Sequence, residues 1–501
     1  MSTSVDSPNR LETAADPRSL RRVVIEPLTR VEGHGKVTIL LDEERRVHQV
    51  RLHVVEFRGF ERFVQGRTYW EIPVLVQRLC GICPVSHHLA AGKAIDMFVG
   101  ARRLTPSAEK IRRLMHLGQI YQSHALHFYY LASPDLLFGF DAEVSKRNVI
   151  GLIAAYPEVA VKAVKMRAWG QEVIRVVAGK RVHGIACIPG GVNKPLDPAG
   201  RETLLRDADT MIAWAKEAVD LSRKLYLSNP EFQERFGVFP SNYLSLVRAD
   251  GGLDLYDGGL RARDASGRTI FDHVDYFRYR QYVDEQVKPW SYMKFPFIRS
   301  LGAEEGWYRV GPLARVNNCD FIPTPLAEAE RKEFRASSGG ALQHASLAYH
   351  WARTIELLHA GEGIKELLLD PETSGRELVT QGEPAREGVG VVEAPRGTLF
   401  HHFKIDEQGL ITKANLIVAT TNNNEAMNRA VRSVAANYLD GRQLTEGLLN
   451  HIEVAIRAYD PCLSCATHAL GKMPLHVELV EADGAVIDTL ARNGDGSFTR
   501  G

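Results

Sequence analysis

Apolar and polar residues alternate most clearly near the N-terminus of the chain. Val50, Leu52 and Val54 alternate with polar residues, which is the period of a half-buried strand. A short charged segment separates residues 36–41 from residues 47–55 and predicts a hairpin turn between two strands. We therefore expect this part of the chain to begin with an antiparallel β hairpin.

Beyond these strands the apolar positions recur at helical spacing. Thr105 followed by Pro106 predicts a capping residue and the first turn of a helix. Ile111, Leu114 and Met115 continue its apolar face, so we expect this helix to run to about residue 132. Further helices are predicted near residues 150–178, 200–228, 341–367 and 425–438, and after Thr445.

The remaining segments predict irregular structure and short strands. Residues 250–330 are rich in glycine, aspartate, proline and aromatic residues, whereas residues 475–490 again read as strands. No internal repeat or clear linker divides the chain. We predict an α+β fold that is predominantly α, with a large helical-bundle core, N-terminal strands over residues 22–57 and peripheral β segments. A disordered tail is expected over residues 1–20 and one large domain over residues 21–468.

Composition excludes several classes of protein. The chain has 501 residues, with 62 lysines and arginines against 61 acidic residues, so its formal charge is only +1. It therefore lacks the basic excess typical of nucleic-acid-binding or polybasic membrane-surface proteins. No apolar run approaches the ~20 residues that span a bilayer, and the polar N-terminus lacks a secretory signal. We expect a cytoplasmic protein with no membrane span and no nucleic-acid partner.

The cysteines carry the strongest chemical signal. Four of the six form two C-x-x-C pairs near opposite ends of the chain, Cys80 with Cys83 and Cys462 with Cys465. Two such pairs can bring four thiolates to one centre, and thiolates favour zinc, nickel, copper(I) or the iron of iron–sulfur clusters.

Besides a reactive metal centre, two other interpretations of the pairs are open at this point. A structural zinc site is the usual use of paired C-x-x-C motifs. Zinc ribbons close short loops, however, whereas these pairs lie almost the whole chain apart, and their flanks carry reactive groups that a structural site does not need: His87, His88, Asp460 and His468. A thioredoxin-type redox motif needs one pair on a βαβ unit, which two distant pairs fit poorly.

Five ordered motifs identify a family that the chain resembles. They are TRVEGH at residues 29–34, FRGFE at residues 57–61, RLCGICPVSHH at residues 78–88, EAPRG at residues 393–397 and DPCLSCATH at residues 460–468. With them the chain resembles the large subunit of [NiFe]-hydrogenases, most closely the soluble, bidirectional, NAD-linked group. The resemblance implies a catalytic subunit that cleaves H2 reversibly and heterolytically into protons and electrons.

The resemblance implies a role for each of the four cysteines. Cys80 and Cys462 would be terminal thiolates on nickel. Cys83 and Cys465 would bridge nickel to a low-spin iron that carries CO and cyanide ligands. An ordinary structural zinc site would need none of the surrounding motifs.

Further residues around the metals follow from the same resemblance. Glu32 resembles the proton-relay carboxylate that lies against the thiolate of Cys462; by itself it could equally be a capping or surface glutamate. Arg396 resembles the arginine that overhangs the metals, with Asp460 as its partner, although a surface ion pair is the ordinary alternative and stabilises little. Thr420 resembles a hydroxyl donor to cyanide, and His87 resembles a histidine that hydrogen-bonds a bridging cysteine.

Some positions depart from the family pattern or have no assignment. Ala419 replaces a proline common in membrane-bound relatives, and Ser123 stands where many relatives carry an acidic residue. His88, His124 and His127 are more often structural residues than ligands, and we give them no role.

A magnesium site near the C-terminus is also implied by the resemblance. Its protein ligands would be Glu61, His468 and the backbone carbonyl of Leu416. Carboxylate and carbonyl oxygens suit this hard cation, whereas imidazole is a less typical ligand.

Residues 469–501 resemble the tail that a dedicated maturation endopeptidase removes after the active-site histidine once nickel is inserted. The tail could hold Cys462 and Cys465 accessible until then. A permanent pair of strands is the alternative.

The cysteine count predicts protein partners. Only Cys187 and Cys319 remain, and an ordinary iron–sulfur cluster needs four cysteine ligands. Electrons must therefore leave through another protein, for which the family supplies a small iron–sulfur subunit. In the NAD-linked group it also supplies diaphorase subunits with FMN. Residues 388–393, GVGVVE, contain two of the three glycines of a dinucleotide fingerprint and read better as a strand, so NAD is expected on a partner.

Three rival functions remain. The same chemistry could be coupled to NADP or another carrier. A non-catalytic subunit resembling the quinone-site subunit of respiratory complex I would lack the four cysteines. A structural zinc protein would hold zinc and no nickel.

Overall fold

The computed structural model describes residues 19–467 together with Ala14 and Asp16. Beyond them it describes the backbone of three strands, β15 (Leu475–Val480), β16 (Val486–Arg492) and β17 (Phe498–Arg500), and the side chains of Asp488 and Arg500. The expected disordered tail over residues 1–20 lies almost entirely outside the described residues. The strands predicted over residues 475–490 are confirmed.

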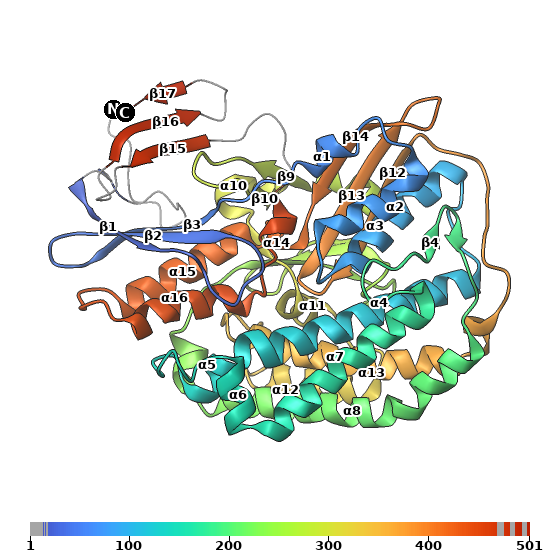
Figure 1. Cartoon of the computed structure of the whole chain (residues 1–501), viewed down its shortest axis with the longest axis horizontal. Helices are drawn as coiled ribbons and strands as arrows, with labels where there is room; N and C mark the ends of the chain where they lie inside the picture. Colours follow the sequence, from blue (N-terminus) through green and yellow to red (C-terminus); the bar gives the residue numbers. More distant parts are fainter. Residues whose placement is uncertain are drawn as a thin grey trace.

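Long helices form one layer of the molecule, drawn at the bottom of Figure 1. They are α4 (Pro106–Leu126), α7 (Pro157–Ala178), α8 (Pro198–Leu227) and α13 (Ala348–Leu369). α13 packs against α4 and α8 and is buried on every side along most of its length, as an apolar helix at the centre of a helical layer must be.

The N-terminal strands form an antiparallel sheet, β1 (Arg21–Ile25), β2 (Gly35–Leu41) and β3 (Val47–Val54), as the alternation of residues predicts. Val50 and Leu52 are fully buried where β3 packs on α15 (Asn424–Tyr438). The predicted hairpin is therefore confirmed.

A second antiparallel sheet, β12 (Glu387–Ala394), β13 (Gly397–Ile405) and β14 (Ile411–Ile417), packs against α3 (Pro84–Asp96). Gly388 and Gly390 allow this contact, since an added Cβ would lie 2.0 Å from Ala94 O and 1.9 Å from Ala90 O respectively. The two glycines of the GVGVVE segment therefore serve close packing of a strand on a helix, as the strand prediction requires.

The remaining elements complete the fold. They are α1 (Phe60–Phe63), α2 (Ile72–Leu75), α5 (Ser133–Phe138), α6 (Val149–Ala155), β4 (Cys187–Ile188), β5 (Gly191–Val192), α9 (Pro230–Glu234), β6 (Asn242–Val247), β7 (Gly259–Arg263), β8 (Thr269–Val274), β9 (Val283–Gln286), β10 (Phe295–Ile298), α10 (Gly302–Glu305), β11 (Tyr308–Arg309), α11 (Pro312–Asn318), α12 (Pro325–Ala336), α14 (Ala419–Asn422) and α16 (Glu446–Ala458). The predicted α+β, predominantly helical fold is confirmed.

Several helix boundaries differ from the prediction. The helix expected over residues 150–178 is two helices, because Pro157 ends the first and begins α7. The helix expected to reach residue 132 ends at Leu126 and continues as a π-helical turn, His127–Ala132. The segment 250–330, predicted to be irregular, contains short strands but also α11 and the start of α12.

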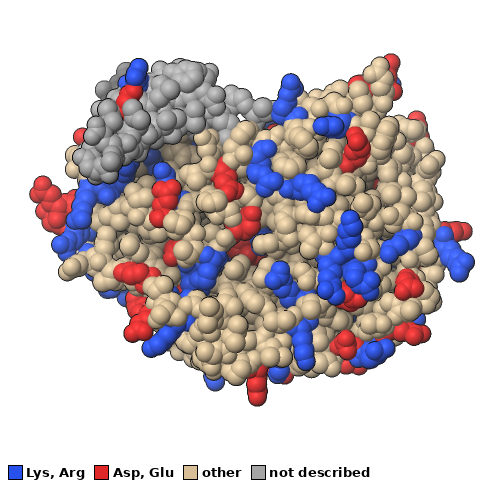
Figure 2. Space-filling model, viewed as in Figure 1, with Lys and Arg blue, Asp and Glu red and all other residues tan. Residues whose placement is uncertain are grey.

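The distribution of charged residues on the surface agrees with the balanced net charge of the sequence. Acidic and basic side chains are mixed over the face shown in Figure 2, with no continuous basic stripe on it. Within the described residues no helix is both long and apolar enough to cross a membrane. The largest hydrophobic core includes all four cysteines of the C-x-x-C pairs, which places this chemistry inside the protein.

Candidate metal centre

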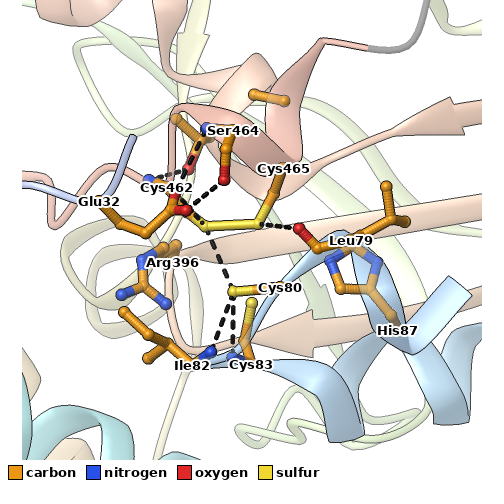
Figure 3. Close-up of a disulfide and its surroundings, with 12 residues drawn as sticks. Glu32, Leu79, Cys80, Ile82, Cys83, His87, Arg396, Cys462, Ser464 and Cys465 are labelled. Atoms are coloured by element: carbon orange, nitrogen blue, oxygen red, sulfur yellow. Dashed lines mark hydrogen bonds between the residues drawn. A yellow bond between two sulfur atoms is a disulfide. The ribbon is translucent and has the colours of Figure 1, made fainter. Parts of the chain in front are cut away.

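The two cysteine pairs meet at one point. One sulfur from each of Cys80, Cys83, Cys462 and Cys465 lies within 4.8 Å of all the others, and all four residues are buried. Among the residues that the structure describes, no other comparable group of metal-binding side chains occurs. Figure 3 shows the pairs approaching from two separate segments of the chain.

Local structure directs each pair inward. Cys80 ends a 3₁₀ turn, and Cys83 immediately precedes α3, whose first residue is Pro84. The second pair follows α16, where Asp460 adopts a positive φ of 54° and so turns the chain out of the helix. Cys465 then lies in a short 3₁₀ turn, Ser464–Ala466.

The sulfur atoms accept hydrogen bonds from the backbone. Ile82 N and Cys83 N donate to Cys80 Sγ at 3.2 and 3.3 Å. Hydrogen bonding from the Cys83 side chain, the positive charge of Arg396 and the Cys83 backbone N–H lower the pKa of the Cys80 thiol, whereas burial opposes them. Cys80 is therefore the first thiol of its pair to become the thiolate that a metal requires.

The second pair is joined as a disulfide in the structure, and Cys80 Sγ lies 3.4 Å from Cys462 Sγ. Because thiolates are the metal ligands, a four-cysteine metal site requires this disulfide to be reduced. Four buried, convergent thiolates fit soft metals such as nickel and iron, and by their donor set alone they also fit zinc.

Glu32 reaches this centre from the N-terminal part of the chain. Its Oε2 lies 2.9 Å from Cys462 Sγ, and the two residues form an isolated parallel β-bridge. Leu463 N donates to the Glu32 carbonyl at 2.9 Å. The predicted neighbour of Cys462 is thus brought to it, in place of the surface position that a lone glutamate would usually occupy.

Arg396 and Asp460 form a buried pair beside the sulfurs. Arg396 Nη2 donates to Asp460 Oδ1 at 2.9 Å, Nε donates to Asp460 O at 2.5 Å, and both side chains are at most 3% exposed. Arg396 Nη1 and Asp460 Oδ2 are buried and have no hydrogen-bond partner in the described structure. The predicted pair is therefore no ordinary surface ion pair, and it retains one unused donor near the cysteines.

A small pocket lies beside Arg396 and two of the cysteines. It is lined by Cys83, His87, Arg396, Thr420 and Cys462 among others. Thr420 Oγ1 accepts a hydrogen bond from Cys462 N at 3.0 Å, so its own hydrogen is available for another acceptor. The His87 ring is fully buried, and its Nδ1 lies 3.1 Å from His401 Nε2.

The residues predicted to bind magnesium are only partly described. Leu416 N donates to Glu61 Oε1 at 2.9 Å, so the carboxylate and this backbone segment are in contact. Burial raises the pKa of Glu61 to about 7. Lys294 Nζ is 3.9 Å from Glu61 Oε1 and 3.2 Å from Glu285 Oε2. His468 lies outside the described residues.

These oxygens fit a hard cation in part. Glu61 offers a carboxylate oxygen, and Glu285 Oε1 nearby is buried without a hydrogen-bond partner among the described residues. Lys294 already brings a positive charge to the same carboxylates, so magnesium would share them with an ammonium group.

The three unassigned histidines all have partners inside the fold. His88 Nδ1 lies 2.8 Å from Pro73 O, His127 Nε2 lies 2.7 Å from Arg457 O, and His124 Nε2 lies 3.0 Å from Glu356 Oε2. These contacts are what structural histidines make. Ser123, also singled out in the sequence, is fully buried on α4.

Sequence reasoning missed a buried ion network behind Arg396. Arg315 binds both oxygens of Glu356 at 2.6 Å, Glu393 Oε2 at 2.9 Å and Ala394 O at 2.8 Å, and these charged side chains are fully buried. Arg315 therefore fixes the backbone that leads into Arg396. The only sequence signal was the glutamate of the EAPRG motif.

Sequence reasoning also missed Ser464, which lies between the two cysteines of the second pair. Ser464 N donates to Glu32 Oε2 at 3.2 Å, and Ser464 Oγ donates to Glu32 Oε1 (Figure 3). A serine inside a C-x-x-C motif gives no signal by itself, since only the fold brings Glu32 to it.

Comparisons with known proteins agree with the geometry. A family model described as "Nickel-dependent hydrogenase" matches residues 58–143 and 261–468, and a model described as "HoxL-like" matches residues 22–57. The chain is 49% identical to the beta subunit of the NAD-reducing hydrogenase HoxS of Cupriavidus necator, over 94% of this chain and 100% of that protein. It is 42% identical to one subunit of the F420-non-reducing hydrogenase of Methanothermobacter thermautotrophicus, over 93% of this chain and 99% of that protein.

Solved structures show the same fold. An NAD+-reducing [NiFe]-hydrogenase in the H2-reduced state matches with a TM-score of 0.88 and 55% identity, over 89% of this chain and 99% of that chain. A [NiFeSe]-hydrogenase from Dm. baculatum has the same fold at 23% identity, with a TM-score of 0.73, over 90% of this chain and 100% of that chain. Since the family model covers both cysteine pairs and the relatives match nearly the whole chain, the protein whose four cysteines meet here belongs to the nickel-dependent hydrogenase family.

Proposed function

We propose that this chain is the catalytic large subunit of a soluble [NiFe]-hydrogenase that passes electrons from H2 to a partner protein and on to NAD+. The observation that carries the proposal is the convergence of four buried cysteines with Glu32 Oε2 placed 2.9 Å from Cys462 Sγ. A structural zinc site would need the cysteines but no carboxylate against one of their sulfurs.

In this proposal the four cysteines hold the metals. Cys80, Cys83, Cys462 and Cys465 would be the protein ligands of a nickel–iron centre whose iron carries CO and cyanide. When bound, the nickel–iron centre supplies the heterolytic cleavage of H2. The protein provides four buried soft thiolates, which suit a redox-active metal.

Proton transfer is the step for which the chain supplies its own groups. A proton held on Sγ of the reduced Cys462 would pass to Glu32 Oε2, so that an S–H bond breaks and an O–H bond forms. Once the disulfide is reduced, the 2.9 Å between Sγ and Oε2 is within reach of direct proton transfer, so no intervening water is needed.

The pocket residues position groups around the metals. Arg396, held by Asp460, lines the pocket, keeps its Nη1 donor unused and contributes a fixed positive charge. Thr420 has a free hydroxyl hydrogen for a cyanide ligand, and His87 lies where it can stabilise a bridging cysteine. Glu61 and the Leu416 carbonyl would hold a magnesium ion, with His468 as the further ligand that the family resemblance implies.

Electrons must leave through partners. Besides the four site cysteines the chain has only Cys187 and Cys319, and burial raises the pKa of each of these thiols to about 12. A small iron–sulfur subunit therefore receives the electrons. The NAD-reducing relatives support diaphorase subunits that carry FMN and NAD. Because the F420-non-reducing relative also matches over nearly its whole length, NADP or another carrier is the alternative electron acceptor.

We further propose a cytoplasmic enzyme whose residues 469–501 are removed by a maturation endopeptidase. The match to the solved NAD+-reducing relative covers 99% of that chain but only 89% of this one. The match to the HoxS beta subunit covers 94% of this chain. A mature chain that lacks its tail would give this difference.

Metal analysis tests the proposal. The protein is purified without oxygen after co-expression with its partner subunits and maturation proteins, and nickel and iron are measured in the processed chain. We expect about one of each in the large subunit. Cys462→Ser should lose the nickel, whereas Cys319→Ser, which removes a buried cysteine outside the site, should retain it. Zinc without nickel in a processed chain would refute the assignment.

A further inference from the structure

The Glu32 carboxylate is held on both of its oxygens by one residue. Ser464 Oγ donates to Oε1, and Ser464 N donates to Oε2 at 3.2 Å. Oε2 is the oxygen that lies 2.9 Å from Cys462 Sγ. The residue that aims this oxygen at the sulfur therefore stands two positions after Cys462 in the same motif.

The backbone of Glu32 is fixed by the same short segment. Leu463 N donates to Glu32 O at 2.9 Å. Gly33 has φ of 86°, and an added Cβ would lie 2.6 Å from Ser464 N. On the other side of Glu32, Arg30 is anchored to Asp135 Oδ1 at 2.6 Å and to Leu131 O at 3.0 Å. With the main chain held in this way, the remaining freedom of Glu32 lies in its side-chain torsions, the last of which rotates the carboxylate.

That rotation matters because the last torsion of a glutamate is broad. Without the hydroxyl, the carboxylate keeps only the backbone donor of Ser464 and samples orientations in which neither oxygen is near the sulfur. Removing one hydrogen bond of the strength typical for a charged group should lower the population of the orientation in which Oε2 faces the sulfur by roughly 10- to 100-fold.

We propose that Ser464 is a positioning residue for proton transfer, holding Glu32 so that Oε2 faces Cys462 Sγ. The inference rests on the proposed function. In the step concerned, a proton leaves the reduced Cys462 thiol for Glu32 Oε2. The S–H bond breaks, an O–H bond forms, and the electron pair of the S–H bond stays on sulfur. No electron is transferred, so no further reactant is needed.

The test uses the matured holoenzyme and compares Ser464→Ala, Ser464→Thr and Glu32→Gln. H2-driven dye reduction is measured in H2O and in D2O, alongside nickel and iron content and the infrared bands of the CO and cyanide ligands. Ser222→Ala is the matched control, since Ser222 is a buried serine on α8 whose hydroxyl pairs with Thr354 and makes no contact with Glu32 or the cysteines in the described structure.

We expect Ser464→Ala to retain both metals and unchanged infrared bands. Its turnover should fall about 10- to 100-fold, and its solvent isotope effect should rise because proton transfer now limits the rate. Ser464→Thr, which keeps a hydroxyl, should recover both quantities. Ser222→Ala should match the unmodified enzyme in both.

Each other outcome has a distinct meaning. Normal turnover in Ser464→Ala with an inactive Glu32→Gln would overturn the positioning role alone. An active Glu32→Gln would overturn the relay role of Glu32 and the positioning role with it, while metal content still decides the hydrogenase assignment. Loss of nickel from Ser464→Ala would show that the hydroxyl serves assembly of the centre, and the positioning role would be wrong.

Discussion

The contact between α3 and β12 yields a prediction that links packing to the metal centre. In Gly390→Ala the new Cβ would lie 1.9 Å from Ala90 O, whereas real Cβ atoms essentially never approach closer than 3.0 Å. The nearest neighbours are backbone atoms of α3 and the Cβ of Lys93, so neither partner can simply turn away. Helix and strand must separate by about 1 Å.

The loss of stability in Gly390→Ala can be estimated from this displacement. A gap of about 0.5–1 Å loses a quarter to a half of each dispersion contact across an interface, and overpacking of a buried site costs about 1–3 kcal/mol. We take ~3 kcal/mol, because Gly388 makes the same close approach next to it. Unfolding entropy of about 2.1 cal/mol/K per residue gives about 1 kcal/mol/K for a chain of this size, so the midpoint should fall by roughly 3 °C.

Gly390→Ala should reduce enzymatic activity more strongly than it reduces thermal stability. α3 begins directly after Cys83, and β12 leads to Arg396 through the turn before β13. A shift of about 1 Å between them changes the spacing between Cys83, a proposed metal ligand, and Arg396, and such errors in an active site cost about 100-fold in rate. The assay is nickel content and H2-dependent dye reduction of the purified mature enzyme, with thermal unfolding followed by circular dichroism.

Gly363→Ala is the control for this experiment. It also adds a methyl group to a buried glycine, but the only close neighbour among the described residues is Leu117 Cδ1 at 2.9 Å, the end of a flexible side chain. It should retain nickel and activity. If Gly390→Ala kept the same midpoint, nickel content and turnover as this control, the reasoning about the α3–β12 contact would be refuted.

Three further predictions follow from buried charged and polar groups. Arg315→Met leaves Glu356 and Glu393 buried without their cation, so it should lower the free energy of unfolding by about 3–5 kcal/mol in urea denaturation; a change below about 1 kcal/mol would contradict it. Burial lowers the pKa of His359 to about 4, so its neutral form stabilises the fold above pH 6.5. That contribution should be lost as the pH falls from about 6.5 to about 4, by about 3 kcal/mol, and His359→Gln should flatten this part of the stability profile; an unchanged slope would count against it. Arg396→Lys keeps the charge but cannot make both contacts to Asp460, so turnover should fall about 100-fold with nickel retained; full activity would show that the guanidinium geometry is not needed.

Local structure was largely predictable because it depends on neighbours in sequence. Thr105 Oγ1 accepts from Ala108 N at 3.3 Å, and Thr445 Oγ1 accepts from Leu448 N at 3.2 Å, so both predicted caps are confirmed. The alternation at residues 50–54 predicted β3 for the same reason. Pro157 also indicates the break between the two helices in the sequence. The prediction of one continuous helix there was wrong because it gave the apolar spacing more weight than the proline.

Long-range contacts were not predictable in this way. The π-helical turn after α4 places His127 against Arg457 O, more than three hundred residues along the chain. No local pattern encodes such a partner. The same holds for Arg315, whose carboxylate partners come from α13 and β12.

The sequence by itself determined the chemistry of the site, since two C-x-x-C pairs with their flanking motifs specify four soft ligands and identify the family. It also determined most helices and strands, because periodicity and capping are local properties of the chain. Only the tertiary structure decided which oxygen of Glu32 faces Cys462, that Ser464 holds it there, and that Arg396 is buried with one donor unused. The physical reason is that these contacts join segments far apart in the sequence, and their geometry arises only when the whole core packs.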